Sequence, residues 1–177
     1  MKIQRRKLLL ILLITIFISI LYIIYPSSVN AQEANFTIYS SGAVLLESST
    51  GKMLYGKNEN EKLYPASTTK ILTAILAIEN CNLSDKITAS NTAITAIPSG
   101  YSNAAIQPGE TLTVQELLEL FLVHSANEVG YILAEHISEN VENFATLMNK
   151  KASELGCKNT HFTNPSGLHD TKHYTTA

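Results

Sequence analysis

Ser67 and Lys70, three positions apart, are the residues that most directly indicate chemistry. They belong to the stretch Pro65-Ala-Ser-Thr-Thr-Lys70, which opens a segment with helical spacing of apolar residues, so both side chains should lie on one face, one turn apart. A serine hydroxyl becomes nucleophilic when a base takes its proton, and a lysine is that base once burial or a neighbouring cation lowers its pKa. Free N–H groups at the helix start would stabilise a developing oxyanion. The pattern suits acyl transfer.

The spacing by itself is weakly specific, because residues 49–52 repeat it inside a predicted turn. On spacing alone, the commoner interpretation is that Ser67 is a hydroxyl at a helix N-terminus and that Lys70 is solvated. A second candidate, Ser125-Ala-Asn127, falls between two predicted helices. Taken alone, Ser125 or Asn127 is more commonly a helix cap.

The pattern of strands and helices predicts an α+β fold, because the strands come first and the helices follow. Two short apolar runs, 42–47 and 52–55, flank a glycine turn and predict a β-hairpin. Helices are expected at 65–79, largely buried, from a capping box at Thr113–Glu116 to near His124, at 128–137 and at 141–155. Short elements and loops are expected over residues 82–110, and a loop is expected from the end of the last helix to residue 177.

The N-terminus carries the pattern of an export signal. Four basic residues among the first seven precede an uncharged apolar run from Leu8 to Tyr25, and small residues at 29–31 predict cleavage after Ala31. The run also reaches the length of an uncleaved membrane anchor, which stays open as the alternative. Residues 32–177 retain nine of the 13 basic side chains against 15 acidic ones, so nucleic acid is not an expected partner. Cys81 and Cys157 are expected to be free, buried thiols.

Taken together, these motifs resemble the low-molecular-mass penicillin-binding proteins, the serine D-Ala-D-Ala carboxypeptidases that share a fold with the serine β-lactamases. The matching segments follow in order along the chain. They are Ala43–Tyr55, Pro65–Lys70, the Gly109-Glu110 turn, Ser125–Asn127, and His161–Leu168 with His173–Ala177. Five matches in order are far more specific than any single one.

The resemblance implies a role for each candidate residue. Ser67 would be the acylated nucleophile, Lys70 the base that activates it, and Ser125 the relay that passes a proton to the leaving D-alanine. Asn127 would hydrogen-bond the peptide group of the substrate. Glu128 stands where many relatives have aspartate. The implied partners are peptidoglycan stem peptides, with β-lactams as covalent inhibitors, outside the cytoplasmic membrane, and membrane contact would come through the N-terminal segment.

The third motif of the family, Lys-Thr-Gly on a sheet strand, does not occur among the 177 residues. The fold is therefore expected to be an incomplete DD-peptidase fold, a helical part plus antiparallel sheet without its later strands, with residues 32–177 as the N-terminal portion of the catalytic domain. The open alternatives are an inactive truncated fragment that at most binds wall peptides or β-lactams and, less favoured, a β-lactamase.

No cofactor or metal is expected. His169 and His173 have the spacing of two zinc ligands on a helix, but no glutamate follows the first histidine and the predicted context is a loop.

Overall fold

The structure, a computed structural model, describes residues 14–16 and 37–177. The chain divides into two compact units, Met1–Ile38 and Tyr39–Ala177, each considered by itself. In the first unit, residues 14–16 are helical, and the rest of the predicted export signal of residues 1–31 lies outside the described residues. Within the two described ranges, no helix is long and apolar enough to cross a membrane.

The second unit begins with an antiparallel hairpin of β1 (Ala43–Leu46) and β2 (Met53–Lys57), as predicted. Its turn is organised by Glu47, whose carboxylate accepts hydrogen bonds from the hydroxyl of Thr50 and from the backbone N–H groups of Ser49 (3.0 Å) and Thr50 (2.8 Å). These bonds favour the charged carboxylate, with the Thr50 hydroxyl contributing most, and lower the pKa of Glu47 to about 2.

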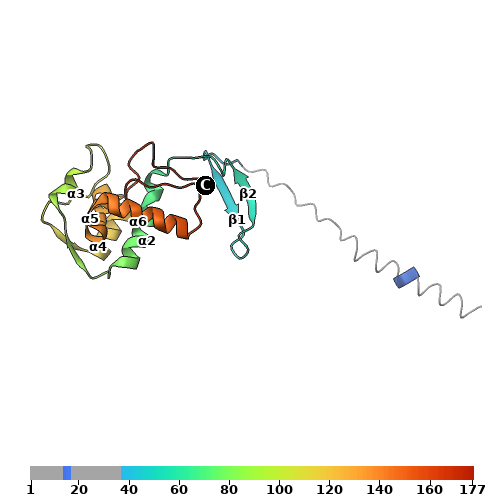
Figure 1. The fold of residues 1–177 in the computed structure, drawn as a ribbon, viewed down its shortest axis with the longest axis horizontal. Helices are drawn as coiled ribbons and strands as arrows, with labels where there is room; N and C mark the ends of the chain where they lie inside the picture. The colour runs from blue at the N-terminus through green and yellow to red at the C-terminus, as the bar shows by residue number, and fades with distance from the viewer. Residues whose placement is uncertain (1–13, 17–36) are drawn as a thin grey trace, which may run out of the picture. The chain divides into compact units, whose positions relative to one another are not determined.

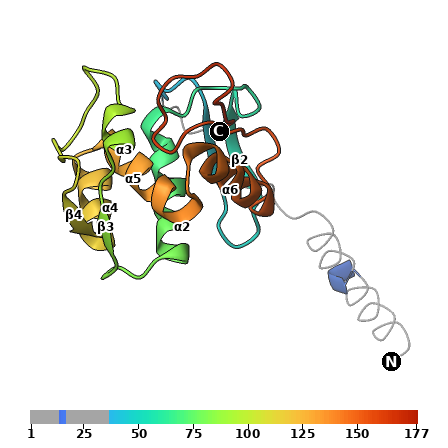
Figure 2. The same cartoon turned by 60° about the vertical axis from the view of Figure 1, so that its left-hand side comes forward.

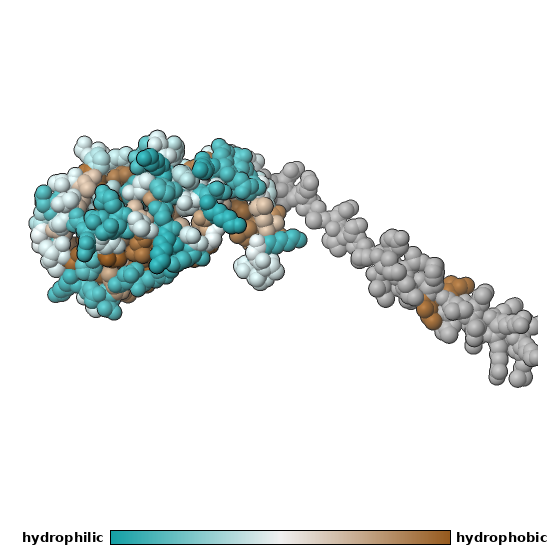
Figure 3. All heavy atoms as spheres, viewed as in Figure 1, coloured by the Kyte–Doolittle hydropathy of each residue, from teal (hydrophilic) through white to brown (hydrophobic). Residues whose placement is uncertain are grey.

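The hairpin exposes much of its apolar surface. Among the described residues, β1 and β2 pair only with each other. Figure 3 shows apolar atoms at the surface in the hairpin region, and the exposed side chains are Val44, Leu45, Leu46, Met53 and Leu54. These apolar side chains of the hairpin are therefore not buried by the rest of the described chain.

A short 3-10 turn, η1 (Ala66–Thr68), leads into helix α2 (Thr69–Asn80). The prediction that this helix is largely buried is wrong for its outer face, where Ile71 and Ile78 are 60% and 59% exposed. The inner face instead buries polar side chains beside small apolar ones: Thr69, Lys70, Thr73, Ala74, Leu76 and Ala77. Apolar spacing alone cannot reveal such a face, because three of the buried side chains are polar.

Helices α4 (Val114–Val123), α5 (Asn127–Ser138) and α6 (Val141–Glu154) pack with α2 into the helical part seen in Figure 1. The predicted capping box is confirmed, with the Thr113 hydroxyl accepting from the Glu116 N–H at 3.2 Å and the Glu116 carboxylate accepting from the Thr113 N–H at 2.8 Å. The largest fully buried side chains include Phe121, Phe144, Leu117, Ile132, Leu133 and Met148.

The polar stretch before α4 forms short elements, as predicted. Strand β3 (Lys86–Thr88) pairs antiparallel with β4 (Thr111–Thr113), and α3 (Asn91–Thr95) lies between them in sequence. The two strands were not predicted individually, because three residues are too few for an alternating pattern to stand out.

The segment after α6 has few regular hydrogen bonds of its own but is held to distant residues. The N–H groups of Leu63 and Thr175 each donate to the other residue's carbonyl, at 2.8 and 2.9 Å. His161 and Tyr174 pair in the same way. Figure 2 shows this dark red segment beside the hairpin and the start of α2. The chain from 155 to 177 thereby covers the N-terminal end of α2.

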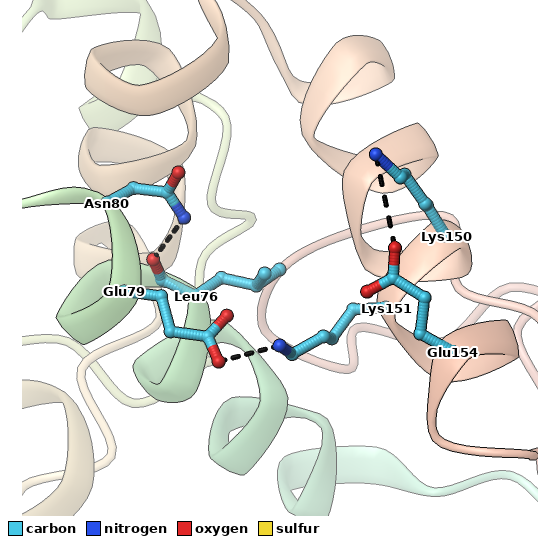
Figure 4. A network of polar contacts seen from close by, with 6 residues as sticks. All are labelled: Leu76, Glu79, Asn80, Lys150, Lys151 and Glu154. Carbon is cyan, nitrogen blue, oxygen red and sulfur yellow. Dashed lines mark hydrogen bonds and ion pairs between the residues drawn. The ribbon is translucent and has the colours of Figure 1, made fainter.

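Helices α2 and α6 are joined on their outer side by a polar contact, shown in Figure 4. Lys151 of α6 forms an ion pair with Glu79 of α2, with an N–O distance of 2.6 Å. Exposed ion pairs contribute about 0–1 kcal/mol, so this pair adds little to the stability of the fold.

Cys81 and Cys157 are both free, as expected. The expectation that both are buried is wrong. Cys81 is half-buried beside the core around α4, and Cys157 is exposed after the C-terminal end of α6.

Candidate active site

Lys70 lies in the first turn of α2 and is only 3% exposed. Its amino group lies 2.8 Å from the Ser125 hydroxyl, 3.0 Å from the Ser125 carbonyl oxygen and 3.4 Å from the Ser67 hydroxyl. Ser67 comes from η1 and Ser125 from the link between α4 and α5, so three segments meet at one amine. The structure thus brings together three of the four predicted site residues.

The backbone is strained at two points that aim this group. Ala66, directly before Ser67, has φ +48°, and Ser125 has φ +57°. A non-glycine residue in this region costs roughly 1–3 kcal/mol, and such residues cluster at functional sites. Ser125 does not cap α5, because the N-cap residue is Ala126, so the interpretation of this motif as a helix cap is wrong.

Two opposing effects set the charge of Lys70. Burial lowers the pKa of Lys70, and the negative charge of Glu128 raises it. Glu128, in the first turn of α5, is 2% exposed, and one carboxylate oxygen accepts from the Ala104 N–H at 2.6 Å. Burial has the larger effect, so the amine is easier to deprotonate than a solvated lysine, as a general base requires.

Asn127 is the first residue of α5 and is 5% exposed. Its side-chain NH₂ donates to the Ser102 carbonyl at 2.8 Å, and its backbone N–H donates to the same oxygen at 3.0 Å. The amide is therefore fixed two positions beyond Ser125. Its predicted contact with a substrate stays a prediction.

The C-terminal segment packs directly on the turn that carries Ser67. The Asn164 side-chain oxygen accepts from the N–H groups of the next residues, including Gly167 at 2.8 Å, and so shapes a tight turn. Gly167 has φ +83°, and a β-carbon there would overlap the carbonyl of Ala66. Thr73 of α2 donates to the Pro165 carbonyl at 2.7 Å. This segment was recognised as a motif, yet its residues carried no predicted role.

His169 and His173 do not share a ligand-binding arrangement. The ring of His169 packs edge-on against Tyr64, with 4.7 Å between centroids, whereas His173 is buried against Thr69. In the part of the chain that the structure describes, no three acidic, histidine or cysteine side chains group as metal ligands.

The chemistry of this arrangement follows from the shared amine. A neutral Lys70 amine can take a proton from the Ser67 hydroxyl and pass one to the Ser125 hydroxyl, its nearest hydroxyl neighbour. A serine activated by a base is the requirement for attack on a carbonyl carbon.

The fold and the site define a class, the DD-peptidase or penicillin-binding proteins. The crystal structure of the D-alanyl-D-alanine carboxypeptidase DacD from Francisella tularensis superposes with a TM-score of 0.75 at 34% identity, covering 82% of this chain and 36% of that one. A Streptomyces K15 DD-transpeptidase superposes with a TM-score of 0.73 at 29% identity, covering 80% of this chain and 58% of that one. The predicted α+β class is confirmed, with small antiparallel sheets that form an incomplete version of this fold.

Residues 28–177 match the family described as D-alanyl-D-alanine carboxypeptidase, peptidase S11, and the chain belongs to this family. It is 42% identical over 176 residues to the D-alanyl-D-alanine carboxypeptidase DacF of Bacillus subtilis, covering 94% of this chain and 44% of that protein. The DacA carboxypeptidase of Haemophilus influenzae is 32% identical over 171 residues, covering 91% of this chain and 44% of that protein. The chain thus spans less than half the length of these two relatives.

Proposed function

We propose that this protein is a serine-type D-Ala-D-Ala carboxypeptidase that removes the terminal D-alanine of peptidoglycan stem pentapeptides through an acyl-serine intermediate. One observation carries the proposal: the buried amine of Lys70 lies between the hydroxyl groups of Ser67 and Ser125. Membership of the peptidase S11 family agrees with it.

In the acylation step, the Ser67 oxygen attacks the carbonyl carbon of the penultimate D-alanine, and its proton moves to the Lys70 amine. The amide C–N bond then breaks as Ser125 gives its proton to the departing amine of the terminal D-alanine. Lys70 returns a proton to Ser125, so the site ends neutral and acylated. The short distance of 2.8 Å between Lys70 and the Ser125 hydroxyl suits this relay.

In the second step, water hydrolyses the acyl-serine ester and the Ser67 oxygen regains a proton. Asn127 is proposed to orient the substrate by hydrogen bonds to its peptide group, from the rigid start of α5. A β-lactam would acylate Ser67 by the same attack, with opening of its ring in place of the release of D-alanine.

The substrate lies outside the cytoplasmic membrane, and the protein is proposed to act there, on peptidoglycan stem peptides. The basic and apolar N-terminal sequence supports export, with cleavage after Ala31 or retention as a membrane contact. No cofactor takes part in the proposed reaction.

The test is labelling of the whole chain, held in detergent, with a fluorescent penicillin, followed by intact mass. We expect a covalent adduct with the wild type and none with Ser67→Ala. Ser49→Ala is the matched control, because Ser49 has the same spacing to a lysine but lies in the hairpin turn, and it should label normally. A folded wild-type chain without an adduct would refute acylation by this group and leave the non-covalent binding alternative.

A further inference from the structure

A buried histidine from the C-terminal segment contacts Thr69, one of the two residues between Ser67 and Lys70. His173 is 2% exposed, and its Nε2 lies 2.8 Å from the hydroxyl of Thr69, the first residue of α2. Thr69 itself is 2% exposed. The contact joins positions 104 residues apart in the sequence.

The other face of the ring determines which nitrogen carries the proton. The backbone N–H of Thr163 points at Nδ1 of His173 from 3.1 Å, so Nδ1 accepts and carries no proton. Nε2 therefore carries the proton and donates it to Thr69 Oγ1. The ring of Phe162 packs edge-on at 5.3 Å between centroids. A second proton on Nδ1 would face two donors, the Thr163 N–H and the Asn164 NH₂ 3.4 Å away, and would push the ring from its seat on Thr69 although Nε2 keeps its own proton.

The charged groups around this ring act in opposite directions. Burial, the largest effect, lowers the pKa of His173, as does His161, while Asp170 raises it. Lys172, the residue before His173, lowers the pKa of Asp170. On the α2 side, the charged group next to Thr69 is Lys70.

A small cavity of about 70 Å³ lies between His173 and the turn that leads to Ser67. Its lining includes Ala66, Gly167, His169, Asp170 and His173. Ala66 immediately precedes Ser67 and has a left-handed backbone. Movement of the segment 161–175 would therefore reach Ser67 through Ala66 and Lys70 through Thr69.

We propose that His173 is a positioning residue for the acylation chemistry. Its neutral imidazole donates to the Thr69 hydroxyl, a contact called the clamp, and so fixes the positions of Ser67 and Lys70 relative to each other. Protonation of the imidazole opens the clamp. The inference rests on the proposed function, because the relative position of Ser67 and Lys70 matters only if Ser67 is acylated. Since its pKa is lowered, the clamp is intact near neutral pH and is lost as the pH falls through the folded-state pKa.

The test is the pH profile of the second-order rate constant for penicillin labelling in the wild type, His173→Gln and His173→Leu. In His173→Gln, the amide keeps a donor for Thr69 but does not titrate, so labelling near neutral pH should stay within about threefold of wild type. As the pH falls, both rates should fall about tenfold per pH unit because Lys70 takes up a proton, and the wild-type rate should drop by about a further tenfold in total as His173 is protonated. His173→Leu should label about tenfold more slowly than wild type near neutral pH, the scale of one lost hydrogen bond, and should approach the wild-type rate at acidic pH, where the wild-type clamp is open.

His136→Gln is the matched control, because His136 is exposed at the end of α5, and its profile should equal that of the wild type. Thr69→Val removes the other partner of the clamp, and combined with His173→Leu it should cost no more than either change alone. A His173→Leu protein with the wild-type rate and profile would overturn the positioning role. A constant ratio of the wild-type rate to the His173→Gln rate at every pH would overturn the protonation step.

A second measurement separates this inference from the proposed function. Amide hydrogen exchange of residues 66–70 should become faster at acidic pH in wild type than in His173→Gln, when the two are compared at each pH. A wild-type chain that shows this difference but no penicillin adduct would keep the clamp and refute the acyl-serine chemistry. Equal exchange in both proteins would refute the opening of the clamp by protonation.

Discussion

Replacing Gly167 by alanine tests whether glycine is needed there because Ala66 leaves no space for a side chain, and not only because the backbone has a positive φ. Gly167 and Gly156 have nearly the same backbone, with φ +83° and +84°. A side chain in this left-handed region costs roughly 1–2 kcal/mol at either position. A β-carbon on Gly156 meets nothing within 4 Å, whereas one on Gly167 overlaps the Ala66 carbonyl and lies 3.0 Å from the Thr69 hydroxyl.

The overlap with backbone cannot be relieved by a side-chain rotation, so the segment at 167 and the turn at 66 must move apart. Forced shifts of this kind cost about 1–3 kcal/mol. We therefore expect Gly167→Ala to lose about 2–5 kcal/mol of unfolding free energy and Gly156→Ala about 1–2 kcal/mol. At about 2–4 °C per kcal/mol for a chain of this size, the two melting temperatures should be clearly resolved.

The assay is thermal unfolding of the whole chain by circular dichroism, together with the rate of fluorescent penicillin labelling per folded molecule. Gly167→Ala should also slow labelling, because Ala66 precedes Ser67, while Gly156→Ala should label at the wild-type rate. Equal melting temperatures for the two variants would refute the steric argument. A destabilised Gly167→Ala protein that labels at the wild-type rate would refute the link between this packing and the position of Ser67.

Three further changes test other parts of the site and fold. Glu128→Gln removes the charge that raises the pKa of Lys70, so the acid limb of the labelling rate should move to lower pH; an unmoved limb would show that Glu128 does not act on Lys70. Ser125→Ala removes the 2.8 Å partner of Lys70 and should slow labelling roughly 10²–10⁴-fold without changing the melting temperature, whereas a rate near wild type would exclude the relay. Thr113→Ala removes the N-cap of α4 and should cost about 0.5–2 kcal/mol in thermal unfolding with normal labelling, and no loss would mean that the capping box is not stabilising.

Local features were predictable where one short stretch of chain determines them. The glycine turn predicted the hairpin, and Thr113 with Glu116 predicted the start of α4, because the donors and acceptors concerned are three residues apart. Ser67 and Lys70 are also three residues apart, so their closeness on one turn could be predicted from the sequence. Ser125 was assigned through the resemblance, since its contact with Lys70 spans 55 positions.

The unpredicted features depend on partners distant in sequence or on buried polar groups. The exposed outer face of α2 was missed because Thr69, Lys70 and Thr73 take the inner positions that apolar residues were expected to fill. No local pattern could identify His173, because its role depends on Thr69 and on the Thr163 N–H that fixes its tautomer.

The distance in sequence between the two halves of this site also governs the order in which it can form. The hairpin forms from contacts close along the chain, but the pairing of Leu63 with Thr175 and the clamp on Thr69 close long loops, whose ordering is slow. During synthesis, Ser67 and Lys70 therefore emerge well before the segment that fixes them. The proposed reaction of Ser67 should therefore become possible only after residues 161–175 dock.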